Sequence, residues 1–257
     1  MNWQLALALC GLAAPLLLVL PLWLLSLARR DVSSVDCAWG PLQLSTGLVY
    51  VALVPESGAR ALPALLLVGA WALRLGLHIA IRNHGQPEDR RYQAIRARNE
   101  PGFGVKSLYL VFGLQAVLAW FVALPLLPIA TSVWPLGWLD ALGFALFLFG
   151  FAFEVVADRQ LLRFVRDPAN RGRVLDSGLW RYTRHPNYFG EFCCAWGLYL
   201  AACAAGGWWT LFAPLTMSFL LLKVSGVALL ERDIGARRPG YADYAARTNA
   251  FFPGRAR

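Results

Sequence analysis

The chain has 257 residues, of which 58% are hydrophobic and only 15% are charged, and its mean hydropathy is +0.50. Soluble domains average roughly 45–50% apolar and about 25% charged residues, so this composition excludes an ordinary water-soluble globular protein. The net charge of +9 could indicate a nucleic-acid partner. Because basic residues that alternate with long apolar runs are typical of membrane loops, we expect no nucleic-acid binding.

Apolar runs long enough to cross a membrane recur along the chain. They predict an all-α, polytopic membrane protein with about seven transmembrane helices. The first run lacks a basic segment before it and is followed by Arg29 and Arg30, which predicts a retained span rather than a cleaved signal peptide. Since no internal repeat or linker is apparent, we predict a single membrane domain over 1–257. The predicted spans are 4–28, 37–54, 61–82, 107–130, 136–157, 189–205 and 208–230.

The basic residues are distributed unevenly between the two ends of these spans. All but three of the 24 Lys and Arg residues lie in the links 29–36, 82–106 and 158–188 and in the tail after Glu231. Because positively charged loops are retained in the cytoplasm, the N-terminus is predicted outside and the C-terminus inside. The other links are short and predict tight turns. These turns are 55–60, 131–135 and 206–207.

The cysteines do not suggest a metal centre or a disulfide framework. All of them lie in or beside apolar runs, without a Cys-x-x-Cys pair and without histidines at metal-ligand spacing. We therefore expect neither a disulfide nor a bound metal. The residues are Cys10, Cys37, Cys193, Cys194 and Cys203.

The densest polar stretch begins near the end of the fifth predicted span. Glu154 and Asp158 are four residues apart and share one face of a helix near the membrane boundary. Arg163 and Arg166 are three apart and continue on a neighbouring face. An interfacial helix whose side chains snorkel to water would explain any one of these arginines, but it explains the whole group less well.

The segment that leads into the sixth predicted span is a candidate anion site. Pro186 suits the first turn of a helix, which places Asn187, Tyr188 and Glu191 on opening turns whose free backbone N–H groups attract anions. Arg184 and His185 add positive charge just before the helix. An aromatic belt with positive-inside arginines is the alternative interpretation. It would explain the aromatic and basic residues but not a carboxylate at Glu191 inside the span.

The string Arg-Tyr-Thr-Arg-His-Pro-Asn-Tyr-Phe-Gly-Glu at 181–191 resembles the signature of the steroid 5-alpha-reductase family, in particular its bacterial, largely uncharacterised branch. Asp158, the run Asp-Pro-Ala-Asn-Arg-Gly at 167–172, and the tail from Glu231 to Tyr244 agree, and the resemblance covers about 31–253. It implies a bacterial inner-membrane protein. The His-Pro-x-Tyr core is also similar to isoprenylcysteine carboxyl methyltransferases, phospholipid methyltransferases and sterol carbon-14 and carbon-7 reductases. All of these bind a nucleotide cofactor near this loop and the C-terminal tail.

The resemblance implies that NADPH is the cofactor and that the cytosolic loops hold it between the last spans. Asp158, Asn187 and Glu191 match family positions that contact the cofactor, and Glu154 stands where the family carries Asn. A Gly-x-Gly-x-x-Gly turn is absent from the sequence, which argues against a Rossmann domain but not against NADPH in this family. The full set of cofactor-binding candidates is Asp158, Arg163, Arg166, Asn170, Arg173, Tyr182, Arg184, His185, Asn187, Tyr188, Glu191, Glu231, Arg232, Tyr241 and Tyr244.

The resemblance also implies a proton donor. Reduction of an enone needs a hydride donor at the beta carbon and a proton donor at the carbonyl oxygen, and the family supplies the second from an acid on an early span and a tyrosine on the next. Asp36 is the candidate acid, although it could instead be the N-cap of the second span. His78 is the second catalytic candidate, and its alternative role is a packed interhelical hydrogen bond. Tyr92 is a candidate by position only.

These features predict a membrane-bound, NADPH-dependent reductase of a carbon–carbon double bond. Its partners would be a lipophilic, steroid- or isoprenoid-like substrate and the surrounding membrane lipid. The alternative is an S-adenosylmethionine-dependent methyltransferase that acts on a lipid or a prenylated thiol. A transporter or scaffold agrees less well, because the polar residues cluster at one face whereas transport sites lie near the bilayer midplane.

Overall fold

The structure is a computed structural model that describes residues 3–224, 226–227, 231 and 238–255. The elements in this part of the chain are all helical, and none is a strand. The chain divides into two compact units. Unit 1 comprises Met1–Gly137 and Ala202–Thr210, and unit 2 comprises Trp138–Ala201 and Leu211–Arg257. The single membrane domain over 1–257 stays a prediction.

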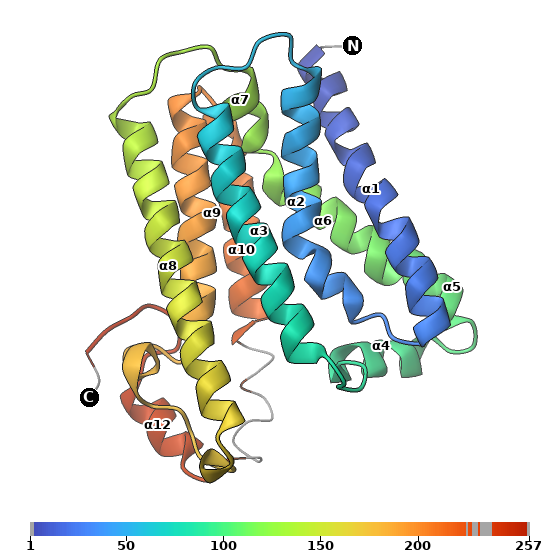
Figure 1. Cartoon of the computed structure of the whole chain (residues 1–257), viewed down its shortest axis with the longest axis vertical. Coiled ribbons are helices and arrows are strands. Elements are labelled where there is room, and N and C mark those ends of the chain that lie inside the picture. The colour runs from blue at the N-terminus through green and yellow to red at the C-terminus, as the bar shows by residue number, and fades with distance from the viewer. Residues whose placement is uncertain (1–2, 225, 228–230, 232–237, 256–257) are drawn as a thin grey trace. The chain divides into compact units, whose positions relative to one another are not determined.

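In unit 1, helix α2 lies at the centre and contacts α1, α3, α6 and α7. Figure 1 shows α1, α2 and α3 side by side, with α4 at the lower end of α1. The buried core includes Leu42 of α2 together with Phe103 and Phe112. The elements are α1 (Trp3–Arg29), α2 (Ser34–Leu53), α3 (Ala61–Asn83), α4 (Arg90–Asn99), α5 (Phe103–Ser107), the π-helix η1 (Leu108–Gly113), α6 (Leu114–Ala123) and α7 (Leu126–Thr131).

A buried arginine fixes two of the predicted turns in unit 1. Arg60 is 0% exposed, although it lies directly before α3. Its guanidinium donates hydrogen bonds to Ser132 Oγ at 2.8 Å, to the Trp134 carbonyl at 3.1 Å and to the Pro135 carbonyl at 3.0 Å. These acceptors satisfy a charge that would otherwise be costly to bury. Arg60 therefore joins the turn before α3 to the turn after α7.

Unit 2 is built on two helices that approach closely, α8 and α9. An added Cβ on Gly150 of α8 would lie 2.5 Å from the Gly190 carbonyl oxygen, and one on Gly190 of α9 would lie 2.7 Å from the Glu154 nitrogen. Such backbone contact requires residues without side chains. The elements of this unit are α8 (Trp138–Arg166), η2 (Pro168–Asn170), η3 (Gly178–Arg181), α9 (Pro186–Ala204, to 201 in this unit), α10 (Phe212–Phe219), η5 (Leu220–Val224) and α12 (Tyr241–Arg247).

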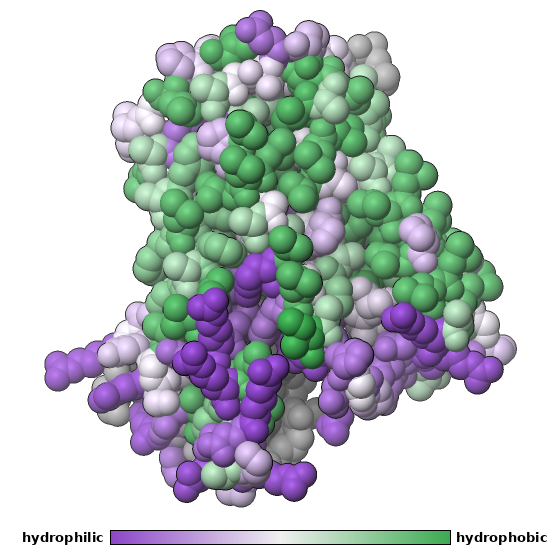
Figure 2. Space-filling view, in the orientation of Figure 1, coloured by the Kyte–Doolittle hydropathy of each residue, from purple (hydrophilic) through white to green (hydrophobic). Residues whose placement is uncertain are grey.

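Among the described residues, four helices are long and apolar enough to cross a membrane: α1, α3, the α5–η1–α6 run Phe103–Ala123, and α8. The chain is thus an integral membrane protein. Figure 2 shows hydrophobic residues over the flanks of the helices, and hydrophilic ones at the ends, around α4 in unit 1 and around α12 in unit 2. The helices α2 and α9 occupy the predicted ranges 37–54 and 189–205, and a shorter apolar helical run covers Trp208–Val224.

One predicted span has the wrong bounds. The sequence predicts a continuous helix over 107–130, but the helix ends at Ala123 and a separate helix, α7, begins at Leu126. Pro125 lies at this break, directly before α7, and Pro128 is the third residue of α7. Since proline lacks a backbone N–H and clashes with the preceding turn, it interrupts the helical hydrogen bonds there.

Candidate functional site

The first candidate residue, Asp36, lies in the opening turn of α2. This helix begins at Ser34, and Ser33 occupies the N-cap position. The interpretation of Asp36 as the N-cap is therefore wrong. As the third residue of the helix, Asp36 is free to direct its carboxylate toward neighbouring elements.

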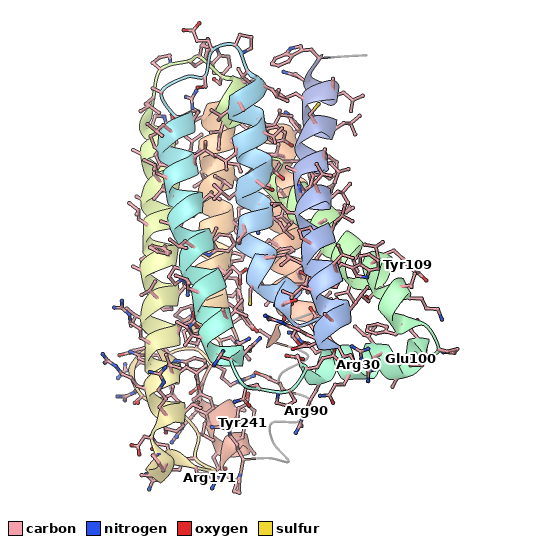
Figure 3. The ribbon with its side chains drawn as sticks, turned by 45° about the vertical axis from the view of Figure 1, so that its right-hand side comes forward. Arg30, Arg90, Glu100, Tyr109, Arg171 and Tyr241 are labelled. Atoms are coloured by element: carbon pink, nitrogen blue, oxygen red, sulfur yellow. The ribbon has the colours of Figure 1, made fainter. Side chains whose placement is uncertain are left out.

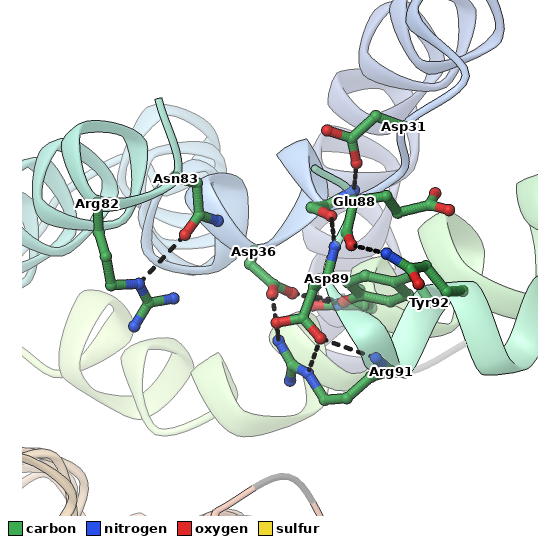
Figure 4. A network of polar contacts seen from close by, with 11 residues as sticks. Asp31, Asp36, Arg82, Asn83, Glu88, Asp89, Arg91 and Tyr92 are labelled. Atoms are coloured by element: carbon green, nitrogen blue, oxygen red, sulfur yellow. Dashed lines mark hydrogen bonds and ion pairs between the residues drawn. The ribbon is translucent and has the colours of Figure 1, made fainter. Parts of the chain in front are cut away.

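Three side chains from two other helices donate hydrogen bonds to the Asp36 carboxylate, and Figure 4 shows two of them, Arg91 and Tyr92, beside it. The Tyr92 hydroxyl donates to Oδ1 at 2.5 Å, and Arg91 Nη2 donates to Oδ2 at 2.7 Å. Gln115 Nε2 donates to Asp36 Oδ1 at 3.3 Å and to the Tyr92 hydroxyl oxygen at 2.9 Å. We call Asp36, Arg91, Tyr92 and Gln115 the acid–tyrosine cluster. It joins α2, α4 and α6 within unit 1.

The loop before α4 holds this cluster in place. Asp89 caps α4 by accepting a hydrogen bond from the Arg91 backbone N–H at 2.9 Å, and it also accepts one from Arg91 Nε at 3.0 Å. The Asp89 backbone N–H donates to Ser33 Oγ at 2.8 Å. Because Ser33 directly precedes α2, the start of α4 is tied to the start of α2. Arg91 and Tyr92 are thereby placed beside Asp36.

The electrostatics keep Tyr92 protonated and Arg91 charged. Burial raises the pKa of Tyr92, and the adjacent Asp36 carboxylate raises it further. Burial alone would lower the pKa of Arg91, but its hydrogen bond to Asp89 and the charge of Asp36 hold that pKa above its ordinary value. At neutral pH the cluster therefore contains a buried neutral phenol. Such a group can supply a proton.

The other catalytic candidate, His78, is half-buried on α3. The catalytic role of His78 stays a prediction. Tyr92, the candidate by position, donates directly to the Asp36 carboxylate. Gln115 was not among the residues selected from the sequence, because a single glutamine in an apolar run carries no recognisable motif.

In unit 2, the loop before α9 is bound to the C-terminal tail through Glu231. Arg184 Nε and Nη2 donate to the Glu231 carboxylate at 2.8 and 2.9 Å, and His185 Nε2 lies 3.0 Å from Glu231 Oε1. Arg184 Nη1 donates to the carbonyls of Ala245 and Thr248 at 2.9 and 2.7 Å. The Arg184 guanidinium is thus engaged by the tail through each of its nitrogens. Arg184 therefore holds the loop before α9 against the C-terminal tail.

Titratable groups in this junction are strongly shifted. Burial alone would raise the pKa of Glu231, but hydrogen bonds from His185 and Arg184 outweigh it and lower this pKa to about 2. Burial and the Glu231 charge raise the pKa of Tyr241 to about 12. Tyr244 donates its hydroxyl proton to the Trp180 carbonyl at 2.5 Å. Tyr241 and Tyr244 thus anchor α12 against the loop.

The opening of α9 agrees with the sequence prediction. The helix begins at Pro186, and its first turns carry Asn187, which is half-buried, and Glu191, which is buried. The Tyr188 ring stacks on the His185 ring with centroids 5.7 Å apart. On α8, Glu154 and Asp158 are both buried, although they are acidic. Buried carboxylates therefore lie on both of the adjoining helices α8 and α9.

A basic pocket of about 470 Å³ lies at the end of α8. Arg166, Asn170, Arg171 and Arg238 line it, together with Asp167. The other predicted residues of this region, Arg163, Arg173 and Tyr182, are exposed, and Arg232 lies outside the described residues. Arg238 Nη1 donates to the Arg173 carbonyl at 2.5 Å, which joins the tail to the loop. Figure 3 shows Arg171 at the end of unit 2 that also carries Tyr241.

Comparisons with known proteins place the chain in a family without an assigned activity. Residues 22–248 match the family described as a protein of unknown function, DUF1295. An uncharacterised protein of Schizosaccharomyces pombe is 25% identical over 272 aligned residues, which cover 95% of this chain and 78% of that relative. No solved structure matches significantly. The chain belongs to the DUF1295 family.

Proposed function

We propose that this protein is a membrane-bound, NADPH-dependent reductase of a carbon–carbon double bond in a lipophilic enone. The observation that carries the proposal is the acid–tyrosine cluster, in which a buried phenol is hydrogen-bonded to Asp36 and Gln115, and Arg91 pairs with Asp36. The DUF1295 family includes steroid 5-alpha-reductase-like proteins. In the steroid 5-alpha-reductase family, which the sequence resembles, an acid on an early span and a tyrosine on the next supply the proton. Asp36 and Tyr92 have the chemistry of that pair.

The residues of unit 2 suit the parts of NADPH. The basic pocket offers Arg166, Arg171 and Arg238, whose guanidinium groups suit phosphates. Asn187 and Glu191 on the opening turns of α9 suit hydroxyl and amide groups, because a carboxylate accepts hydrogen bonds and an amide does both. When bound, NADPH would supply a hydride to the beta carbon of the enone.

Tyr92 would donate the proton that accompanies this reduction. In the present arrangement its hydroxyl points to Asp36. Donation to a substrate carbonyl oxygen requires the hydroxyl to turn from the carboxylate while the Gln115 N–H retains the phenol oxygen. As the proton leaves, the Gln115 N–H would stay donated to the phenol oxygen, while Arg91 balances the negative charge of Asp36 beside it. The hydride on the beta carbon and the proton on the carbonyl oxygen give an enol, and its tautomerisation, which moves the proton to the alpha carbon, gives the saturated ketone.

We propose in addition that the chain crosses the bacterial inner membrane seven times, with the N-terminus outside and the C-terminus in the cytoplasm. The uneven distribution of Lys and Arg supports this orientation. The helices α2 and α9 lie at two of the predicted spans, 37–54 and 189–205, which supports a count of seven. The proposed cofactor groups would then lie on the side where NADPH is available.

The activity can be tested with purified protein, NADPH and a panel of steroid and isoprenoid enones. We expect one class to be reduced, and we expect Tyr92→Phe to lower the rate about 10²–10⁴-fold, the range for loss of a general acid. Tyr109→Phe is the matched control, because Tyr109 is 61% exposed in the same unit. Equal rates for the Tyr92 and Tyr109 variants would show that Tyr92 is not the proton donor.

A further inference from the structure

A second cavity lies in unit 1, apart from the residues of the acid–tyrosine cluster. Its volume is about 540 Å³, which is within the range of small-molecule sites. The end of α1, the end of α4 and the start of α5 form its walls. We call it the boundary pocket, and the lining residues used below are Leu27, Arg30, Val32, Arg96, Glu100 and Phe103.

The boundary pocket lies where two candidate membrane spans meet water. Leu27 belongs to the last turn of α1, and Phe103 is the first residue of the span Phe103–Ala123. Trp23 Nε1 donates to the Gly104 carbonyl at 2.9 Å, which holds these two span ends together. A cavity at this depth can take a lipid headgroup at its polar mouth and part of an acyl chain along its apolar wall.

The charges around the mouth are of both signs. Arg96 Nη2 is 2.7 Å from Glu88 Oε1, so Glu88 balances most of its charge. The Arg96 guanidinium also lies 4.6 Å from the centre of the Phe103 ring and donates to the Arg30 carbonyl at 3.2 Å. No described group accepts a hydrogen bond from the Arg30 side chain. The two other charged side chains at the mouth are Arg30 and Glu100, which Figure 3 shows near the lower end of α1. The Glu100 carboxylate accepts only the long Phe103 N–H bond of 3.4 Å among the described groups, and its charge also acts on Arg96.

Arg30 is placed at this mouth by an unusual backbone conformation. Its φ is 52°, in the left-handed region that residues other than glycine rarely adopt. This conformation ends α1, and the backbone N–H of Asp31 donates to the Ser26 carbonyl at 3.2 Å. This cap fixes the direction in which the chain leaves α1 and places Arg30 beside the cavity.

We propose that the boundary pocket binds the headgroup of an aminophospholipid. Arg30, with Arg96 beside it, would hold the phosphate, and Glu100 would hold the primary ammonium group. Leu27, which is 38% exposed, would contact the start of an acyl chain. A choline headgroup has no N–H to donate to Glu100, and a glycerol headgroup leaves Glu100 facing a phosphate without an intervening cation. The site should therefore prefer phosphatidylethanolamine. This proposal does not depend on the proposed reductase activity.

The preference can be measured by native mass spectrometry of the detergent-purified chain with added phosphatidylethanolamine, phosphatidylcholine or phosphatidylglycerol. We expect the ethanolamine lipid to be retained most. Arg30→Gln should weaken its binding about 10-fold to 100-fold, the loss expected for one charged hydrogen bond, and Arg30→Lys should restore most of it. Glu100→Gln should weaken the binding of phosphatidylethanolamine, because it removes the partner of the ammonium group. It should strengthen the binding of phosphatidylglycerol, because it removes the repulsion between the carboxylate and the phosphate.

Arg29→Gln is the matched control, since Arg29 is the adjacent basic residue and is not part of the pocket lining. Equal retention of all three lipids would overturn the proposal, as would equal weakening by Arg29→Gln and Arg30→Gln. Glycerophosphoethanolamine tests whether the source of the headgroup is a lipid. If this soluble headgroup binds as tightly as the whole phospholipid, the pocket is not a lipid site.

Discussion

Tyr92 acquires its chemistry from residues that are distant in the sequence. Asp36 and Tyr92 are 56 positions apart, and Gln115 comes from a third helix. Neither carboxylate nor phenol would be a distinctive feature alone. Together they give a neutral buried phenol whose oxygen is held by Gln115 and whose proton is directed to Asp36.

At the same scale, Glu231 predicts a pH dependence of stability. Its folded pKa of about 2 is below the ordinary value of 4.5. A carboxylate with a lowered folded pKa stabilises the protein above the unfolded pKa, and this contribution is lost as the pH falls from about 4.5 toward about 2. The melting temperature of the natural chain should therefore exceed that of Glu231→Gln at about pH 7, and the difference should shrink by about pH 3. A difference that stayed constant over this range would contradict the assigned ion pair.

At the scale of single elements, the crossing of α8 and α9 depends on glycine. An added Cβ on Gly190 would meet backbone and side-chain atoms of Glu154 at 2.7 Å. Since backbone cannot move as a side chain can, we expect Gly190→Ala to destabilise the fold by about 1–3 kcal/mol. Gly69→Ala on α3 is the control, because its Cβ would meet only Leu44 at 3.8 Å. Thermal unfolding of both variants measures the effect, and equal melting temperatures would show that the two helices are further apart.

The opening turns of α9 carry a second prediction at this scale. Asn187 and Glu191 are four residues apart, so they share one face of the helix. If they bind the cofactor, Glu191→Ala should raise the NADPH Kd about 10-fold to 100-fold, as expected for one charged hydrogen bond, and Asn187→Ala should raise it about 2-fold to 10-fold, as expected for a neutral one. Apo melting temperature should be measured beside the Kd. A fall in melting temperature with unchanged affinity would assign these side chains a structural role.

The start of α9 shows what a sequence can predict about an element. Pro186 has a strong local preference for the first helical turn, and the helix begins there. The apolar runs likewise predicted the helices, because the length of an apolar run is a local property. The break between Ala123 and Leu126 was missed, since the apolar composition continues through both prolines.

For the whole molecule, the positive-inside distribution predicts the side on which polar segments lie. Within unit 2 the loop and tail are joined, because Arg247 Nη2 lies 2.5 Å from Asp176 Oδ2 and Arg238 donates to the Arg173 carbonyl. Cysteines introduced at Arg173 and Arg247 should therefore react with an impermeant reagent from the cytoplasmic side only. The background must lack the exposed Cys10. Labelling of the two positions from opposite sides would refute the proposed topology.

Long-range pairing accounts for most of what the sequence did not predict. The candidates Arg184 and Glu231 were both selected from the sequence, but their ion pair was not, because 47 residues separate them. Tyr92 was a candidate by position only, and Gln115 was not selected at all. Residue type and spacing define local elements, whereas the partner of a buried polar group depends on how distant helices pack.

The most direct test of the proposed function is a thermal titration of the purified protein with NADPH and, separately, with S-adenosylmethionine. A ligand that binds only the folded state stabilises it by about 2.7 kcal/mol at one hundred times its Kd. We expect NADPH to raise the melting temperature in a concentration-dependent manner and S-adenosylmethionine to leave it unchanged. A rise with S-adenosylmethionine alone would contradict the reductase and favour the methyltransferase.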